Sequence, residues 1–149
     1  MLRRAVDAFD PAKAAMPSLR MIVVCGPRID PNMFGARDGL EVVGFVPRLY
    51  RHLAACDVAL VQGGLTTTME LVANRRPFVY APLNDHFEQQ FHVRHRLDRY
   101  RAGRRVDGNA APDEIADAIG DALACPVDYR PVAVDGARRA ASAIAELLN

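Results

Sequence analysis

The sequence of 149 residues has no long apolar run and no excess of charge of one sign. No apolar stretch approaches the roughly 20 residues that cross a bilayer as a helix, so a transmembrane segment is not expected. Residues 1–16 interleave charged and apolar side chains and lack the apolar centre of a secretory signal peptide. Nineteen basic against eighteen acidic side chains give a net charge of +1, so the overall charge favours neither nucleic acid nor an anionic membrane as a partner.

Cysteine is also scarce, and its three positions are far apart: Cys25, Cys56 and Cys125. An odd number, without a CxxC pair or a Cys/His cluster, excludes a disulfide framework and a zinc site. The spacing favours buried free thiols in a reducing, cytoplasmic compartment. The glycine fingerprints GxGxxG and GxxxxGK[ST] are absent, which disfavours a nicotinamide cofactor and a P-loop. We therefore expect neither a metal ion nor a cofactor.

Short apolar runs alternate with helical patterns along the whole chain, without repeats or a linker. The length predicts one domain over residues 1–149. The predicted strands are apolar throughout, which is typical of a parallel sheet covered on both faces. The sequence thus predicts an α/β, Rossmann-like, doubly wound parallel sheet. The predicted strands are 19–25, 41–46, 57–61, 77–81 and a short one at 103–106; the predicted helices are 2–15, 48–55, 65–74, 86–100, 112–124 and 135–148, with a loop or short helical turn in 27–39.

The third predicted strand ends in Gln62, Gly63 and Gly64, and ligands of such sheets bind beyond the carboxyl ends of the strands. Two glycines before a helix let a ligand approach the backbone closely, and the free N–H groups and dipole of the helix suit a phosphate. The threonines at 66–68 can add hydroxyl donors or cap the helix. Glu70 follows at a spacing where its carboxylate can accept hydrogen bonds from ribose hydroxyls. This spacing indicates a nucleotide site.

Four segments resemble, in order, the C-terminal, donor-binding domain of GT-B glycosyltransferases, specifically glycosyltransferase family 28 and its MurG-like relatives. They are Val42–Pro47 (VVGFVP), Leu53–Gly64 (LAACDVALVQGG), Leu65–Pro82 (LTTTMELVANRRPFVYAP) and Asp85–Val93 (DHFEQQFHV). The resemblance implies the C-terminal half of a GT-B fold. It also implies an inverting, metal-independent enzyme that transfers a hexosyl group from a UDP- or TDP-sugar to a hydroxyl acceptor.

The resemblance further implies a role for individual residues in binding this donor. Gly63, Gly64, Thr66 and Thr67 would hold the diphosphate, Glu70 the ribose, Phe45 and Val46 the base, and Gln89 with Glu88 the donor sugar, with His86 in the loop beside it. Gln62 stands where many relatives carry His, and it can donate a hydrogen bond but not a charge. Glu88 and His92 stand where Asp and Asn are usual, so the resemblance does not name the sugar.

Two parts of the family's architecture have no counterpart in this sequence. Family domains begin with a strand and a Gly-rich loop, whereas this sequence begins in the helix that would follow them. The acceptor-binding N-terminal domain, which supplies the general base in inverting members, is missing too. We therefore expect a fragment of a larger transferase, inactive alone and without a catalytic residue of its own, whose partners are the nucleotide-sugar and that N-terminal domain. A sheet without its first strand would leave unpaired edges, which favour a homodimer.

Two other functional classes fit the same pattern. One is half of a nucleotide-sugar 2-epimerase-like enzyme, which would need carboxylates and His across a two-domain cleft. The other is a non-catalytic module that uses the cleft for nucleotide binding or assembly. The arginines of residues 94–105 surround their predicted helix, which favours a solvated face over contact with an anionic partner or with lipid at the inner face of the membrane.

Overall fold

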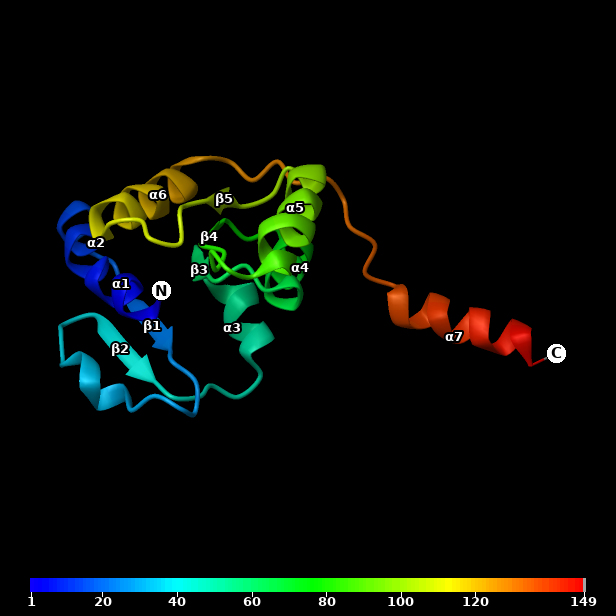
Figure 1. The fold of residues 1–149 in the computed structure, drawn as a ribbon, viewed down its shortest axis with the longest axis horizontal. Helices are drawn as coiled ribbons and strands as arrows, with labels where there is room; N and C mark the ends of the chain where they lie inside the picture. Colours follow the sequence, from blue (N-terminus) through cyan, green and yellow to red (C-terminus); the bar gives the residue numbers. More distant parts are fainter. Residues whose placement is uncertain (149) are drawn as a thin grey trace.

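The computed structural model describes residues 1–148, which form an α/β body from which the last helix projects (Figure 1). In chain order the elements are α1 (Leu2–Asp7), α2 (Phe9–Ala15), β1 (Met21–Val24), the 3-10 turn η1 (Pro31–Phe34), β2 (Leu40–Val43), α3 (Leu49–Ala55), β3 (Ala59–Val61), α4 (Leu65–Ala73), β4 (Phe78–Tyr80), the π-helix η2 (Glu88–Val93), α5 (Arg94–Tyr100), β5 (Arg104–Arg105), α6 (Pro112–Ala124) and α7 (Gly136–Leu147). The predicted alternation of strands and helices is confirmed.

All strand pairs are parallel, as predicted, but the strands form two sheets instead of one. β1 pairs with β2, and β3, β4 and β5 follow one another in the second sheet. No strand in residues 1–148 lies between β1 and β3, which agrees with the expectation of a doubly wound sheet without its first strand. Each of these two strands keeps one unpaired edge.

Helices cover both faces of the three-stranded sheet, as expected for a doubly wound fold. Successive side chains of a strand point to opposite faces. Phe78 and Tyr80 of β4 belong to one apolar cluster, with residues of α4 and α5, whereas Val79 belongs to a second one with residues of α6 and with Ala8. The smaller sheet is covered less well, since Val23 is buried but Ile22 is 56% exposed.

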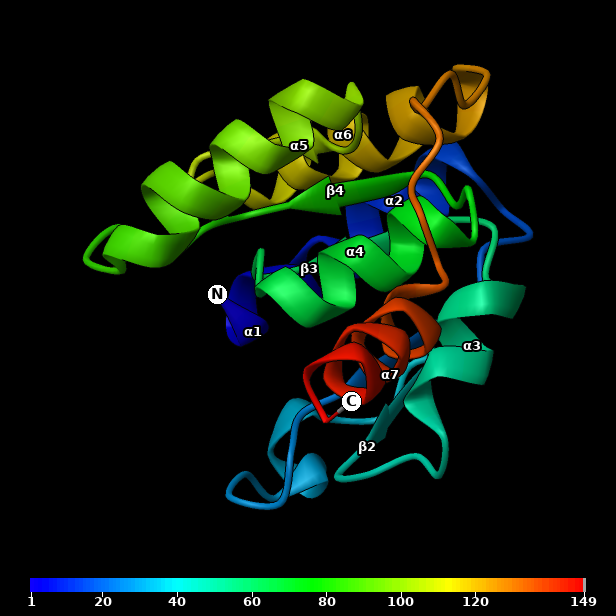
Figure 2. The same ribbon diagram turned by 90° about the vertical axis from the view of Figure 1, so that its right-hand side faces the viewer.

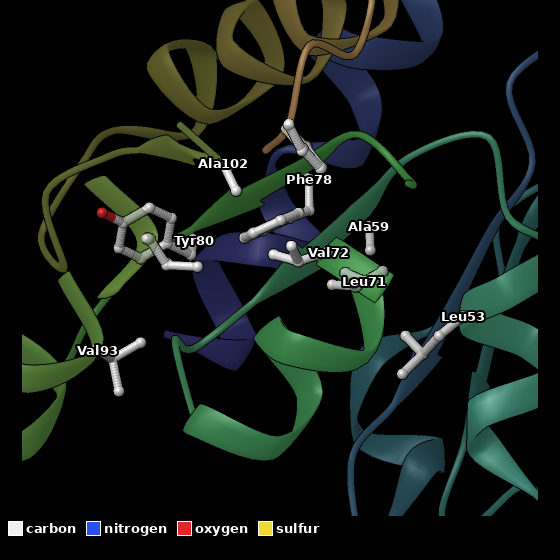
Figure 3. Close-up of a cluster of buried hydrophobic side chains, with 10 residues drawn as sticks. Leu53, Ala59, Leu71, Val72, Phe78, Tyr80, Val93 and Ala102 are labelled. Atoms are coloured by element: carbon white, nitrogen blue, oxygen red, sulfur yellow. The ribbon is translucent and has the colours of Figure 1, made fainter. Parts of the chain in front are cut away.

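The larger cluster fixes α4 against the sheet (Figure 3). Leu71 and Val72 of α4 are buried against Phe78, and Leu53 of α3 closes one end of the cluster. α3 and α4 also pack directly on each other. The buried second half of α4 thus fixes the position of the whole helix, including its start after the two glycines.

Three sequence predictions are corrected at the level of local structure. The predicted helix 2–15 divides at Ala8, because Pro11 has no N–H and its ring excludes the carbonyl of Asp7 from a continuous helix. The predicted strand 41–46 ends at Val43. Among the predicted buried thiols, Cys125 is exposed, since it caps the end of α6 at the surface.

Two buried tyrosines are expected to lower stability at alkaline pH. Burial raises the pKa of Tyr80 above its ordinary value of 10.0, and the nearby Asp98 adds to the effect; burial likewise raises the pKa of Tyr129. A raised pKa in the folded state means that stability is complete below pH 10 and falls as the pH rises above it, through the folded-state pKa. We expect Tyr80→Phe to reduce this alkaline loss, because only the unsubstituted side chain must ionise in a buried place.

The measurement is the free energy of unfolding in urea at about pH 8 and about pH 11. Tyr50→Phe is the matched control, because Tyr50 is 50% exposed on α3. Comparing each variant with the unsubstituted protein cancels the contributions of other groups. Equal alkaline losses for Tyr80→Phe and Tyr50→Phe would contradict the prediction.

Candidate functional site

The loop after β3 lies next to the end of β4. Gly63 has a φ of +88°, and a Cβ there would lie 3.3 Å from Cδ2 of Tyr80, so this position requires glycine. Gly64 is the N-cap of α4, and a Cβ there would meet no atom within 4 Å. The backbone at Gly64 is therefore not crowded by neighbouring side chains.

The first turn of α4 offers hydrogen-bond donors that the protein does not use. The N-cap is Gly64 and not one of the threonines, and the amides of Leu65–Thr67 have no backbone acceptor in the described part of the chain. The hydroxyl of Thr68 is buried and is 2.9 Å from the carbonyl oxygen of Gly64. Thr66 is exposed and Thr67 is half-buried, and neither hydroxyl has a partner within residues 1–148. The positive end of this helix is thus open to an anion.

Glu70 lies on the same face of α4 as these two threonines, one turn further along, because side chains three and four residues apart are neighbours on a helix. It is half-buried, and its carboxylate has no cation and no hydrogen-bond donor within residues 1–148. The hydrogen bond at this residue goes from the Asn74 amide to the backbone carbonyl of Glu70, and leaves the carboxylate free. The unused amides of the first turn of α4 and the free carboxylate of Glu70 therefore lie one helical turn apart, as the sequence spacing predicted.

The loop after β4 runs beside the glycine turn, since β3 and β4 pair in parallel and Gly63 lies against Tyr80 and Pro82. Gln89 is buried and turned inward, and its Oε1 accepts a hydrogen bond of 2.9 Å from the N–H of Leu83. Its carbonyl thus shapes the loop, and its contact with a donor sugar stays a prediction.

The remaining predicted residues divide between this edge and the other sheet. His86, Glu88 and Gln62 are exposed at the carboxyl ends of β3 and β4, so the structure brings them to the edge that carries Glu70. Phe45 and Val46 follow β2, which belongs to the other sheet. Phe45 is 75% exposed and Val46 is half-buried, and their role at a base stays a prediction.

The sequence did not indicate the open-sided cavity of about 370 Å³ at this edge. The guanidinium of Arg4 closes one side, where its Nη1 donates to the carbonyl of Gly108 at 2.6 Å and to Oδ1 of Asn109 at 2.9 Å. These contacts join residues more than 100 positions apart, so no local pattern could predict them. The lining residues are Met1, Arg4, Ala81, Leu83, Asn84, Asp85, His86, Gly108 and Asn109.

Residues 1–148 lack two further kinds of feature. They contain no group of three or more His, Cys, Asp or Glu side chains arranged to hold a metal ion. They also contain no helix with the length and apolar character that crossing a membrane requires.

Comparison of the sequence with known proteins gives two distant relatives, while no family model matches the chain. An uncharacterized glycosyltransferase of Methanosarcina acetivorans is 23% identical over 108 residues, which are 72% of this chain and 28% of the relative. One from Methanosarcina mazei is 28% identical over 104 residues, which are 69% of this chain and 27% of the relative. The chain thus spans little more than a quarter of the length of the proteins that it matches.

Solved structures identify the fold. The glycotransferase of kitacinnamycin superimposes with a TM-score of 0.68 at 22% identity, over 83% of this chain and 31% of the other. The glycosyltransferase VinC, solved in complex with DTDP, superimposes with a TM-score of 0.63 at 19% identity, over 80% of this chain and 29% of the other. The fold is that of a GT-B glycosyltransferase domain. The α/β fold class predicted from the sequence is confirmed, and the similarity to glycosyltransferases holds for sequence and structure alike.

Proposed function

We propose that this chain is the donor-binding domain of a glycosyltransferase of the family 28 or MurG-like kind, with UDP- or TDP-sugar as the donor. One observation carries the proposal: within a GT-B fold, the unused amides at the start of α4 lie one turn from the free carboxylate of Glu70. An anion-binding helix end followed by a hydrogen-bond acceptor matches the diphosphate and ribose of a nucleotide.

The proposed reaction is inverting transfer of a hexosyl group to a hydroxyl acceptor. As the bond between the sugar and the diphosphate breaks, negative charge grows on the leaving diphosphate. The N–H groups of Leu65–Thr67 and the dipole of α4 would stabilise this charge in the role that a metal ion has in other transferases. The general base and the acceptor site would belong to the N-terminal acceptor-binding domain, so this chain alone would bind the donor without turning it over.

The test is a calorimetric titration of the chain with UDP, TDP, GDP and NAD. We expect UDP or TDP to bind more tightly than GDP and NAD, with micromolar to millimolar affinity, because one half of a cleft supplies only part of the contacts. Equal affinity for all four nucleotides would show a general anion site and would contradict a donor site. No binding of UDP or TDP at millimolar concentration would also contradict the proposal.

A further inference from the structure

Two consecutive glutamines of η2 hold both backbone polar groups of Leu83, in the loop after β4. The N–H of Leu83 donates to Oε1 of Gln89 at 2.9 Å, and Nε2 of Gln90 donates to the carbonyl oxygen of Leu83 at 3.0 Å. The same carbonyl accepts from the N–H of His86 at 3.1 Å, which closes a turn over residues 83–86. In Figure 2 the chain leaves the end of β4, passes through this loop and runs back as the helix that continues into α5. The turn is thus tied to the helical segment that follows it.

Arg105 fixes the orientation of the Gln90 amide from the neighbouring strand. It is the last residue of β5, paired with Tyr80 of β4, and its Nη2 donates to Oε1 of Gln90 at 2.9 Å. A guanidinium only donates and a backbone carbonyl only accepts, so the Gln90 amide satisfies both of its partners in one orientation and neither in the reverse one. A chain of hydrogen bonds therefore runs from Arg105 through Gln90 to the carbonyl of Leu83.

The side chain of Gln89 keeps one donor that the protein does not use. Gln89 is 9% exposed, and its Oε1 is occupied by the N–H of Leu83. Its Nε2 has no hydrogen-bond partner within residues 1–148, and it is not sealed from solvent, since Nε of Arg76 is the one sealed and unpartnered side-chain atom in that part of the chain. A free carboxamide NH₂ group can donate to the hydroxyl oxygens of a sugar.

We propose that Gln90 and Arg105 are positioning residues for the donor sugar, an inference that rests on the proposed function. They hold the turn 83–86, the turn holds Oε1 of Gln89, and this bond leaves Nε2 of Gln89 as the group that meets the sugar. The proposed contacts of the diphosphate and the ribose belong to α4, which is a separate element. Loss of the hydrogen-bond chain should therefore weaken the binding of the sugar and spare that of the nucleoside diphosphate.

Calorimetric titration of Gln90→Leu and of the unsubstituted chain tests the proposal, with UDP compared with UDP-glucose and TDP compared with TDP-glucose. Leucine has a similar size and makes neither hydrogen bond. We expect Gln90→Leu to bind the sugar nucleotide about tenfold more weakly and the matching nucleoside diphosphate less than about twofold more weakly. Gln90 is half-buried and Arg105 is exposed, so the urea midpoint should hardly change, and it is measured alongside. Equal losses for the two ligands, or no loss for either, would overturn the proposal.

Further variants separate the hydrogen bonds from charge. Gln90→Glu keeps a partner for Arg105 but has no donor for the carbonyl of Leu83, so it should lose as much affinity for the sugar nucleotide as Gln90→Leu. Arg105→Gln should also lose affinity, and Arg105→Lys should restore most of it, because a single hydrogen bond does not need the fork of a guanidinium. Full affinity in Gln90→Glu, or no rescue by Arg105→Lys, would contradict the proposed chain of contacts.

Arg104→Gln is the matched control. Arg104 precedes Arg105 on β5 and is also exposed, but successive side chains of a strand point to opposite faces, and its guanidinium pairs with Asp121 of α6. Its substitution removes the same charge without touching the turn. A loss of sugar affinity equal to that of Arg105→Gln would reduce the result to net charge and overturn the proposal.

Amide hydrogen exchange reports on the turn without a ligand and separates this proposal from the proposed function. The N–H groups of Leu83 and His86 donate to Oε1 of Gln89 and to the carbonyl of Leu83, so both should exchange faster in Gln90→Leu than in the unsubstituted chain. Unchanged exchange would overturn the positioning role whatever the nucleotides do. Faster exchange in a chain that binds neither UDP nor TDP would refute the proposed function, and the role toward the sugar with it.

Discussion

Gly103→Ala is expected to destabilise the fold strongly. Gly103 has a φ of +73°, which costs an alanine roughly 1–2 kcal/mol. The added Cβ would also lie 2.4 Å from Cε2 of Phe78, a ring that is 1% exposed and is held in the larger cluster. Overpacking of this kind costs about 1–3 kcal/mol, so we expect a total loss of about 2–5 kcal/mol in the free energy of unfolding.

Chemical denaturation at neutral pH measures this loss, and Gly120→Ala is its matched control. Gly120 lies inside α6, where a Cβ would meet no atom within 4 Å, so alanine should stabilise the helix by up to about 1 kcal/mol. The two variants add the same methyl group with opposite expected signs. In a Phe78→Leu background, Gly103→Ala should cost less free energy of unfolding than in the unsubstituted chain. The smaller side chain relieves the steric clash, but the backbone strain of an alanine at position 103 remains. Equal midpoints for the two glycine variants would show that the chain near Gly103 can move away from Phe78.

Elements whose signals are local were predictable from the sequence. The predicted helix 112–124 agrees with α6 because Pro112 occupies its first position and the Glu114 carboxylate accepts from the N–H of Ala111 at 2.7 Å. The predicted helix 65–74 agrees with α4 to one residue, since two glycines precede it and Asn74 ends it. The open end of α4 and the position of Glu70 follow from this agreement.

Features that depend on distant parts of the chain were not predictable. The apolar patterns of β1 and β3 do not show which strands are neighbours, so the unpaired edges were expected only from the resemblance, which implies a missing first strand. The inward turn of Gln89 depends on the backbone N–H of Leu83, which has no sequence signature. The sequence also predicted an ordinary helix over residues 86–100, whereas its first part is a π-helix. A polar pattern does not distinguish the four-residue from the five-residue spacing of backbone hydrogen bonds.

Replacing Glu70 by alanine is expected to weaken the binding of UDP by about 2–4 kcal/mol, or roughly 30- to 700-fold. The reason is the loss of hydrogen bonds from ribose hydroxyls to a carboxylate, which are stronger than those between neutral groups. Loss of the negative charge also removes some repulsion of the diphosphate, so the measured effect is a lower bound on the contribution of the ribose contact. Asp117→Ala is the charge-matched control, because Asp117 is exposed on α6 and has no partner within residues 1–148.

A cycle with a second ligand separates the ribose contact from a change of fold. 2′,3′-Dideoxy-UDP lacks both hydroxyls, so Glu70→Ala should weaken its binding little, whereas the unsubstituted chain should bind it much less tightly than UDP. TDP carries only the 3′-hydroxyl and should fall between the two. If Glu70→Ala weakened UDP and dideoxy-UDP equally, the carboxylate would act on the structure of α4 and not on the ribose. If UDP bound and Glu70→Ala changed nothing, the nucleotide would occupy this edge in another orientation, with the cavity beside Arg4 and His86 as its alternative place.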